Sequence, residues 1–245
     1  MSKFRTRLRN VGRTTGGFGF AVATQPKPRY ILVVAEAADA AAATAAGEAG
    51  ADAVVLRQGD AATLGALSGK TVAGVWLEDA NGSAVTMVRD AGADFFVFDD
   101  ARASASALTP PEIGRILLLG PDQDAERLRS VSPIDLDAVI VAAEAGTITV
   151  RDQLALRRVA TLTGAPLLIA AGGAPDTASL EAWRDAGALA VLVSGDAAAV
   201  RRVVEAADAV PAPRKREDRD RVTPLIGAPS VAAHSHDDED DDDGE

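Results

Sequence analysis

Cysteine is absent from the 245-residue chain, and its two histidines, His234 and His236, both lie near the carboxyl end. The absence of cysteine excludes disulfides, thiolate nucleophiles and cysteine-ligated metal sites. Because no histidine precedes residue 234, the body of the chain cannot supply a three-histidine zinc site or a Ser-His-Asp triad. Acid–base chemistry in that body must therefore rest mainly on carboxylates.

Aromatic residues make up only 4% of the chain, and no apolar run reaches the roughly 18 residues that a membrane-spanning helix needs. The first 13 residues are basic and contain no apolar segment of the kind that a secretory signal requires. We therefore expect a cytoplasmic protein whose core is built mainly from alanine, valine and leucine.

Charge is segregated along the chain. The net charge of −11 is made up of +7 over residues 1–29, −12 over residues 30–213 and −6 over residues 214–245. An acidic body of this kind repels phosphate backbones, so we expect no nucleic-acid partner. The charged segment 208–245 cannot bury apolar surface and is expected to be a disordered acidic tail.

Residues 1–29 form a basic arm in which Phe4 and Leu8 share one helical face. The arm suits two uses. It can lie on an anionic membrane surface with Phe4 and Leu8 inserted, or it can dock on the acidic body of its own chain or of a neighbouring subunit in an oligomer. The acidic charge close at hand favours docking. Phe18 and Phe20, which follow, are candidates for closing one end of the body.

A repeated pattern divides residues 30–207. Segments 90–98 and 185–193 each have the pattern of a helix end, a glycine stop and a buried strand. Other apolar runs alternate with such segments, which predicts eight strands beginning near residues 30, 52, 71, 94, 115, 137, 166 and 189. Eight strands alternating with helices indicate a compact (β/α)8 TIM barrel over residues 30–207. An open doubly wound sheet is the alternative, but no G-x-G-x-x-G motif follows the first strand.

Carboxylates follow most of the predicted strands, at the end of a barrel where reactions take place. Glu78, Asp99 and Glu144 each end an apolar run directly, so they are the candidate catalytic residues for proton transfer. Carboxylates crowded in this way could also hold Mg²⁺. The alternative is that strand-end acids merely cap the next helix, and four are well placed to do so: Asp39, Asp79, Asp100 and Asp122.

The predicted seventh and eighth strands end in Gly172-Gly173 and Ser194-Gly195. This pair of endings resembles the phosphate-binding half of the aldolase-type, phosphate-binding TIM-barrel superfamily. That group includes FMN-dependent barrels such as the nitronate monooxygenases, and thiamine-phosphate enzymes. The resemblance implies that backbone N–H groups at these four positions hold the phosphate of a ligand or of FMN. The chain departs from the pattern in its Ser-Gly order, in Asp196, and in lacking a strand-end lysine.

Two functional hypotheses follow. In the first, the barrel binds a small phosphorylated ligand or FMN at the ends of strands seven and eight, and if it is an enzyme it is a lyase, an isomerase or an FMN-linked oxidoreductase. In the second, it is a catalytically degenerate barrel that serves as a scaffold and contacts partners through its arm and tail. The missing lysine, histidine and cysteine favour the second hypothesis, and the glycine endings favour the first.

Overall fold

The structure, a computed structural model, describes residues 2–13 and 28–213. Its centre is a closed barrel of eight parallel strands that pair in chain order, with the last strand paired to the first. The strands are β1 (Leu32–Ala37), β2 (Ala53–Leu56), β3 (Ala73–Trp76), β4 (Phe95–Asp99), β5 (Gly114–Leu118), β6 (Ala138–Glu144), β7 (Leu167–Gly172) and β8 (Ala188–Ser194). The predicted TIM barrel is confirmed, and each strand begins within two residues of its expected position.

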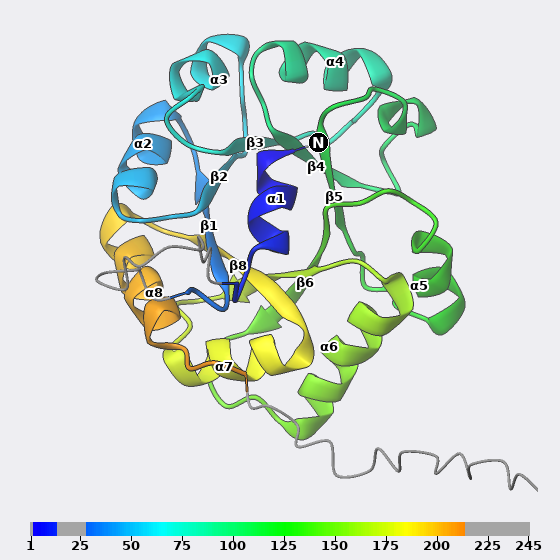
Figure 1. The fold of residues 1–245 in the computed structure, drawn as a ribbon. Helices are drawn as coiled ribbons and strands as arrows, with labels where there is room; N and C mark the ends of the chain where they lie inside the picture. Colours follow the sequence, from blue (N-terminus) through cyan, green and yellow to red (C-terminus); the bar gives the residue numbers. More distant parts are fainter. Residues whose placement is uncertain (1, 14–27, 214–245) are drawn as a thin grey trace, which may run out of the picture. The chain divides into compact units, whose positions relative to one another are not determined.

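Helices surround the barrel, as Figure 1 shows. They are α2 (Ala40–Glu48), α3 (Ala61–Leu67), α4 (Gly82–Asp90), α5 (Ala125–Val131), α6 (Val150–Thr163), α7 (Thr177–Ala186) and α8 (Ala197–Ala209). Between β4 and β5 the chain forms only a 3-10 turn, η1 (Ala105–Leu108), where the alternating pattern predicted a full helix. Pro110 and Pro111 follow this turn, and because proline lacks the N–H that a helix interior needs, no helix continues there.

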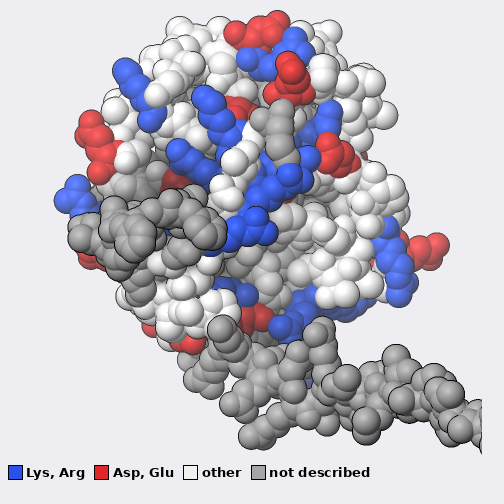
Figure 2. Space-filling view, in the orientation of Figure 1, with Lys and Arg blue, Asp and Glu red and all other residues white. Residues whose placement is uncertain are grey.

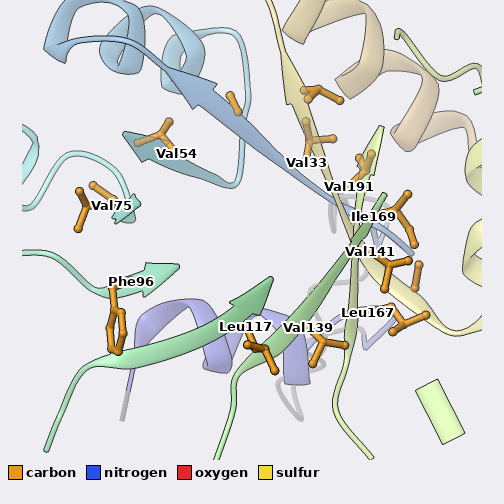
Figure 3. Packing of buried hydrophobic residues seen from close by; sticks show 14 of the residues in the cluster. Val33, Val54, Val75, Phe96, Leu117, Val139, Val141, Leu167, Ile169 and Val191 are labelled. Carbon is orange, nitrogen blue, oxygen red and sulfur yellow. The ribbon is translucent and has the colours of Figure 1, made fainter. Parts of the chain in front are cut away.

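Side chains alternate between the two faces of the barrel wall and form two apolar cores. On β1, Leu32 and Val34 belong to the cluster inside the barrel, whereas Val33 packs in the cluster between the strands and the helices. Figure 3 shows the outer cluster. The aromatic pair on β4 divides in the same way, with Phe95 inside and Phe96 outside. This alternation decides which residues at a strand end face the barrel mouth.

The inner core is tight enough to require glycine on β3. A β-carbon built at Gly74 would overlap the ring of Phe95, so any side chain at this position displaces a buried aromatic. Gly74 and Phe95 are register partners on adjacent strands, which is why the two groups compete for one space. Here glycine serves close packing rather than an unusual backbone angle.

The arm begins with a helix, α1 (Lys3–Arg9), that lies across the amino ends of the strands, at the centre of the view in Figure 1. Phe4 and Leu8 are 0% and 2% exposed, and the ring centroids of Phe4 and Phe95 are 4.9 Å apart. Asp94, which directly precedes β4, accepts hydrogen bonds from the backbone N–H groups of Lys3 and Phe4, both at 2.8 Å. The helix therefore closes the barrel at this end.

Two further carboxylates anchor α1. Arg5 forms ion pairs with Asp137 and, at 2.8 Å, with Asp135, while the Ser2 hydroxyl donates to Asp137. Burial raises the pKa of Asp137 above its ordinary value although both partners favour its charged form. A β-carbon at Gly114 would overlap the Asp137 carboxylate, so this glycine leaves room for the anchor.

The arm is thus docked on its own barrel, and Phe4 and Leu8 are buried there instead of facing a membrane. The expected closing residues, Phe18 and Phe20, lie outside the described part of the chain. Exposed basic side chains remain on the outer side of α1, and Figure 2 shows Lys and Arg gathering at the centre of this face. Those on the arm are Lys3, Arg7, Arg9 and Arg13.

At the other end of the described chain, α8 runs to Ala209, two residues beyond the predicted barrel boundary. The compact unit that contains the barrel and α1 ends at Pro213. The buried Arg184 donates to the carbonyl of Pro211, in the segment that follows α8. The expected tail lies outside the described residues from position 214 onward. In residues 2–13 and 28–213, no helix combines the length and the apolar character needed to cross a bilayer.

Candidate functional site

A cavity of about 480 Å³ opens at the carboxyl ends of the strands. Its floor is apolar and consists of inward-facing side chains on β5, β6 and β8: Leu118, Ile140 and Leu192. Its wall carries the polar groups, because the next inward position on several strands is charged or hydroxylic. These wall residues are Glu36, Arg57, Trp76, Glu78, Asp99, Arg102, Glu144 and Ser194.

Glu36 is the best-shielded carboxylate of the cavity, with 10% of its side chain exposed. It lies within β1, two residues beyond the inward-facing Val34, so the alternation of the strand turns it into the mouth. Arg57 forms an ion pair with one carboxylate oxygen, and the Ser194 hydroxyl donates to the other. Together the two partners hold the carboxylate in one orientation.

Trp76 lies beside this network at the end of β3. The guanidinium carbon of Arg57 sits 5.8 Å from the centroid of the Trp76 ring, within the range of a cation–π contact. The indole Nε1 of Trp76 is buried and has no hydrogen-bond partner among the described residues. A buried donor left without an acceptor costs about 1–3 kcal/mol. Trp76 is also one of the residues that line the cavity.

The three expected catalytic carboxylates all line this one cavity, in different settings. Glu78 is 77% exposed and pairs with Arg102 at 3.3 Å, which places it at the rim. Asp99 ends β4 and accepts a 2.8 Å hydrogen bond from the backbone N–H of Ala101. Glu144 ends β6 and has no ion pair among the described residues.

Glu144 owes its position to its neighbour on β7. Gly172 is the register partner of Glu144, and a β-carbon built at Gly172 would overlap both carboxylate oxygens. The absence of a side chain at Gly172 therefore lets the Glu144 carboxylate lie flat over the end of β7. This gives the first glycine of the Gly-Gly pair a function that does not involve phosphate.

Of the other three residues expected to bind phosphate, one lines the cavity and two do not. Ser194 lines the cavity, but its hydroxyl is used by Glu36. Gly173 and Gly195 are outside the cavity lining; both have positive φ, of 106° and 145°, which favours glycine. No atom lies within 4 Å of a β-carbon built at Gly173, but its backbone N–H already donates to the carbonyl of Ala171 at 3.1 Å.

The amino end of α8, where such a phosphate would sit, is already capped. Asp196 accepts a 2.8 Å hydrogen bond from the backbone N–H of Ala199, and α8 starts at the next residue, Ala197. The Asp196 carboxylate thus takes the place that an anion occupies at a helix amino end. With the Glu36 and Glu144 carboxylates on the flanking strands, these residues fit a phosphate group poorly.

The described carboxylates of the cavity do not form a magnesium site either. In residues 2–13 and 28–213, no group of three or more histidine, cysteine, aspartate or glutamate side chains converges as a metal site would require. The cavity carboxylates stand on β1, β4 and β6, apart from Glu78, which follows β3, so they are spread around the ring.

Helix capping follows a different set of residues from the one expected. Asp39 does cap α2, as predicted, by accepting from the Ala42 N–H at 2.8 Å. The predictions for Asp79, Asp100 and Asp122 are wrong: Asn81 caps α4 and Asp124 caps α5. Asp79 instead pairs with Arg102 at 3.1 Å, and Asp100 and Asp122 pair with Arg127 at 2.8 and 3.9 Å. Capping depends on the exact first residue of a helix, which the strand pattern does not define.

From the sequence, Glu36 and Arg57 could be placed at the ends of the first two strands but were given no specific role, and Trp76 was overlooked. Glu36 interrupts the apolar β1 segment Leu-Val-Val-Ala-Glu-Ala instead of following it. Counting inward positions from Val34 would have selected it, and the same count along β3 selects Trp76. Arg102, which comes from the loop after β4, carries no comparable signal.

No protein-family model matches the chain, and no curated protein matches it. Solved structures do resemble it. The crystal structure of KGPDC from Streptococcus mutans aligns with a TM-score of 0.59 at 12% identity, over 72% of this chain and 97% of that one. The homocysteine methyltransferase MmuM from Escherichia coli, in its apo form, aligns with a TM-score of 0.50 at 15% identity, over 71% of this chain and 95% of that one. At such identities the likeness shows the TIM-barrel fold alone.

Proposed function

We propose that this TIM barrel binds a small polar ligand in its mouth and that Glu144 and Asp99 are its proton-transfer groups. The observation that carries the proposal is the pairing of an oriented carboxylate with an unsatisfied donor. Glu36 is held by Arg57 and Ser194, and beside it the Trp76 indole N–H lacks a partner within the described residues. A pocket with an apolar floor and a few fixed polar groups is the usual form of a small-molecule site.

The charges of the wall restrict the chemical class of the ligand. Four carboxylates and two guanidinium groups line the cavity, and both arginines already pair with carboxylates: Arg57 with Glu36, and Arg102 with Glu78. Glu144 and Asp99 remain as acceptors for donor groups of a ligand. We infer a neutral or cationic ligand that carries hydroxyl or amino groups for these carboxylates and one acceptor atom for Trp76.

Glu144 is the better candidate for moving a proton. It has no ion-pair partner in the described part of the chain, and it lies over Gly172 at the edge of the apolar floor. Such a carboxylate can accept a proton from a bound ligand and return it elsewhere, as lyase and isomerase reactions require. Asp99 faces the same cavity and would serve as the second group.

The narrower proposal of a phosphorylated ligand or FMN has one observation in its favour, the open space beside Gly173. Asp196 at the amino end of α8 and the carboxylates of Glu36 and Glu144 oppose it electrostatically. The remaining alternative is a barrel without a ligand that acts as a scaffold. Each of the three proposals predicts a different binding result.

The two tryptophans allow the mouth to be tested alone. In a Trp183→Phe protein, Trp76 is the only tryptophan, so its fluorescence reports directly on the cavity. Thermal shift and Trp76 fluorescence would be measured with glucose, glucosamine, their 6-phosphates, FMN and MgCl₂. Mouth binding by neutral or cationic ligands predicts that glucosamine-type compounds change the Trp76 signal and raise Tm by mass action.

Substitutions test which side chains contribute to ligand binding. Glu144→Gln should weaken binding about tenfold, the change expected when one charge-assisted hydrogen bond to the ligand is lost. Glu48→Gln, on the exposed side of α2 and outside the cavity, should leave binding unchanged. A preference for the phosphorylated compounds that Gly173→Asp abolishes would establish the phosphate proposal instead. Failure of every compound to change either signal would favour the scaffold.

A further inference from the structure

A second cavity, of about 350 Å³, lies on the opposite side of β6 from the mouth. The outward-facing Val141 and the helix residues Leu156 and Val159 form its apolar interior, and all three belong to the core between the strands and the helices. Polar side chains stand at its edge: Gln123, Thr147 and Asp152. Its volume falls within the range of about 300–1,000 Å³ that is common for small-ligand sites.

One residue of the cavity lining carries a buried donor without a partner in the described part of the chain. Trp183, on α7, lines the cavity and is 0% exposed, and its indole Nε1 has no hydrogen-bond partner among the described residues. The neighbouring polar groups are engaged elsewhere: Gln153 donates to the carbonyl of Ala182, and Asp152 accepts from Thr149 in the α6 cap. Buried N–H groups are rarely left without an acceptor, so Trp183 is the residue of the lining that calls for a partner.

We propose that this cavity is a second ligand site, which takes a small, mainly apolar, uncharged molecule with one hydrogen-bond acceptor directed at Trp183. The apolar interior favours a hydrocarbon body, because burying a charge there would have no compensating partner. Anions are excluded further by two carboxylates of the lining, Asp152 and Glu144. Aromatic or branched ketones and amides have the required form: one carbonyl oxygen on a compact apolar frame.

The second site borders the first. Ala142, Ala143 and Glu144, the last three residues of β6, line both cavities. A molecule behind β6 therefore contacts the strand segment whose inner side carries Glu144. The proposal does not depend on the function proposed for the mouth, because the Trp183 donor and the apolar interior define the site by themselves.

A matched pair of probes tests the acceptor directly. Acetophenone and α-methylstyrene have nearly the same shape, but only acetophenone carries a carbonyl oxygen. The indole N–H signals of the full-length protein would be recorded by ¹H–¹⁵N NMR and assigned with Trp76→Phe and Trp183→Phe. We expect acetophenone to shift the Trp183 signal in a saturable way, α-methylstyrene to bind about tenfold more weakly, and benzoate not to bind.

Two variants keep the test independent of the tryptophan. Ala155 is an exposed residue of α6 at the cavity edge, so Ala155→Phe should block entry without disturbing the core and should abolish the acetophenone shift. Leu154→Phe is the matched control, since Leu154 is 61% exposed and does not line the cavity. It should leave binding unchanged.

The proposal is overturned if acetophenone leaves the Trp183 signal unmoved up to its solubility limit, or if the shift persists in Ala155→Phe. Equal affinities for acetophenone and α-methylstyrene would also overturn it, because the indole would then play no part. A shift of the Trp76 signal alone would assign the binding to the mouth and count against the second site. These results are distinct from those for the mouth, since each cavity has its own tryptophan.

Discussion

Replacing Phe4 by alanine tests whether α1 is an integral part of the barrel core. Phe4 is completely buried, packs on Phe95 and belongs to the same inner cluster as Val34. Its removal leaves a cavity at the amino end of the barrel that the rigid strand wall cannot fill. Phenylalanine-to-alanine changes in such settings cost about 3–5 kcal/mol, which combines the lost transfer energy with the cavity.

If Phe4→Ala detached α1 completely, the loss in the free energy of unfolding would be larger. If the helix leaves its seat, the hydrogen bonds from the Lys3 and Phe4 backbone to Asp94 and the ion pairs of Arg5 are lost as well. The ring of Phe95 then faces water, which at about 25 cal/mol per Å² is unfavourable by a further few kcal/mol. We therefore expect Phe4→Ala to lower the free energy of unfolding by about 3–4 kcal/mol.

Urea unfolding followed by circular dichroism measures this loss. With a slope of about 2–3 kcal/mol per M, the midpoint should fall by about 1–2 M. Met87→Ala on α4 is the control: its side chain is 63% exposed, so its effect should stay within about 0.5 kcal/mol. If Phe4→Ala changes the midpoint no more than this control, α1 contributes nothing to the stability of the barrel and the reasoning fails.

Three further changes test other parts of the fold. Gly74→Ala should lower stability by about 3 kcal/mol because its β-carbon overlaps the Phe95 ring, and an unchanged Tm would contradict the inner packing. Thr149→Ala removes the cap of α6 and should cost about 1 kcal/mol by urea unfolding, with no loss if the cap is dispensable. Hydrogen bonds from Ser179 lower the pKa of Asp176 below its ordinary 3.8, so this carboxylate stabilises the fold above pH 3.8 and less as pH falls through the lowered pKa. Between about pH 5 and 3 the urea midpoint should therefore fall less in Asp176→Asn than in the natural chain, and equal slopes would refute the assignment.

The strands could be predicted because the barrel buries both faces of each one. Continuous apolar runs such as Phe95–Phe98 are required wherever a strand is covered by the interior on one side and helices on the other. Helix ends were harder to predict, since several acids lie near each start and only one becomes the cap. Asp122 and Asp124 illustrate this, because only Asp124 directly precedes α5.

The candidate site could be predicted only in part. Position after a strand was enough to bring Glu78, Asp99 and Glu144 to one cavity. It could not show that Gly172 makes room for Glu144, because that contact depends on the register between β6 and β7. Nor could it reveal the unpaired donor of Trp183, because the surroundings of this indole are set by the packing of α6 and α7 on β6.

The packing of α1 against the amino ends of the strands also has a consequence for the order of folding. The helix precedes all eight strands of the barrel in the chain, and its anchors, Asp94 and Asp137, follow it by about 90 and 130 residues. Contacts between residues this far apart in the sequence form slowly, because a long loop of chain must first be ordered. We expect α1 to join after β4 and β6 have paired within the wall, so that a change such as Phe4→Ala speeds unfolding and leaves the folding rate nearly unaltered.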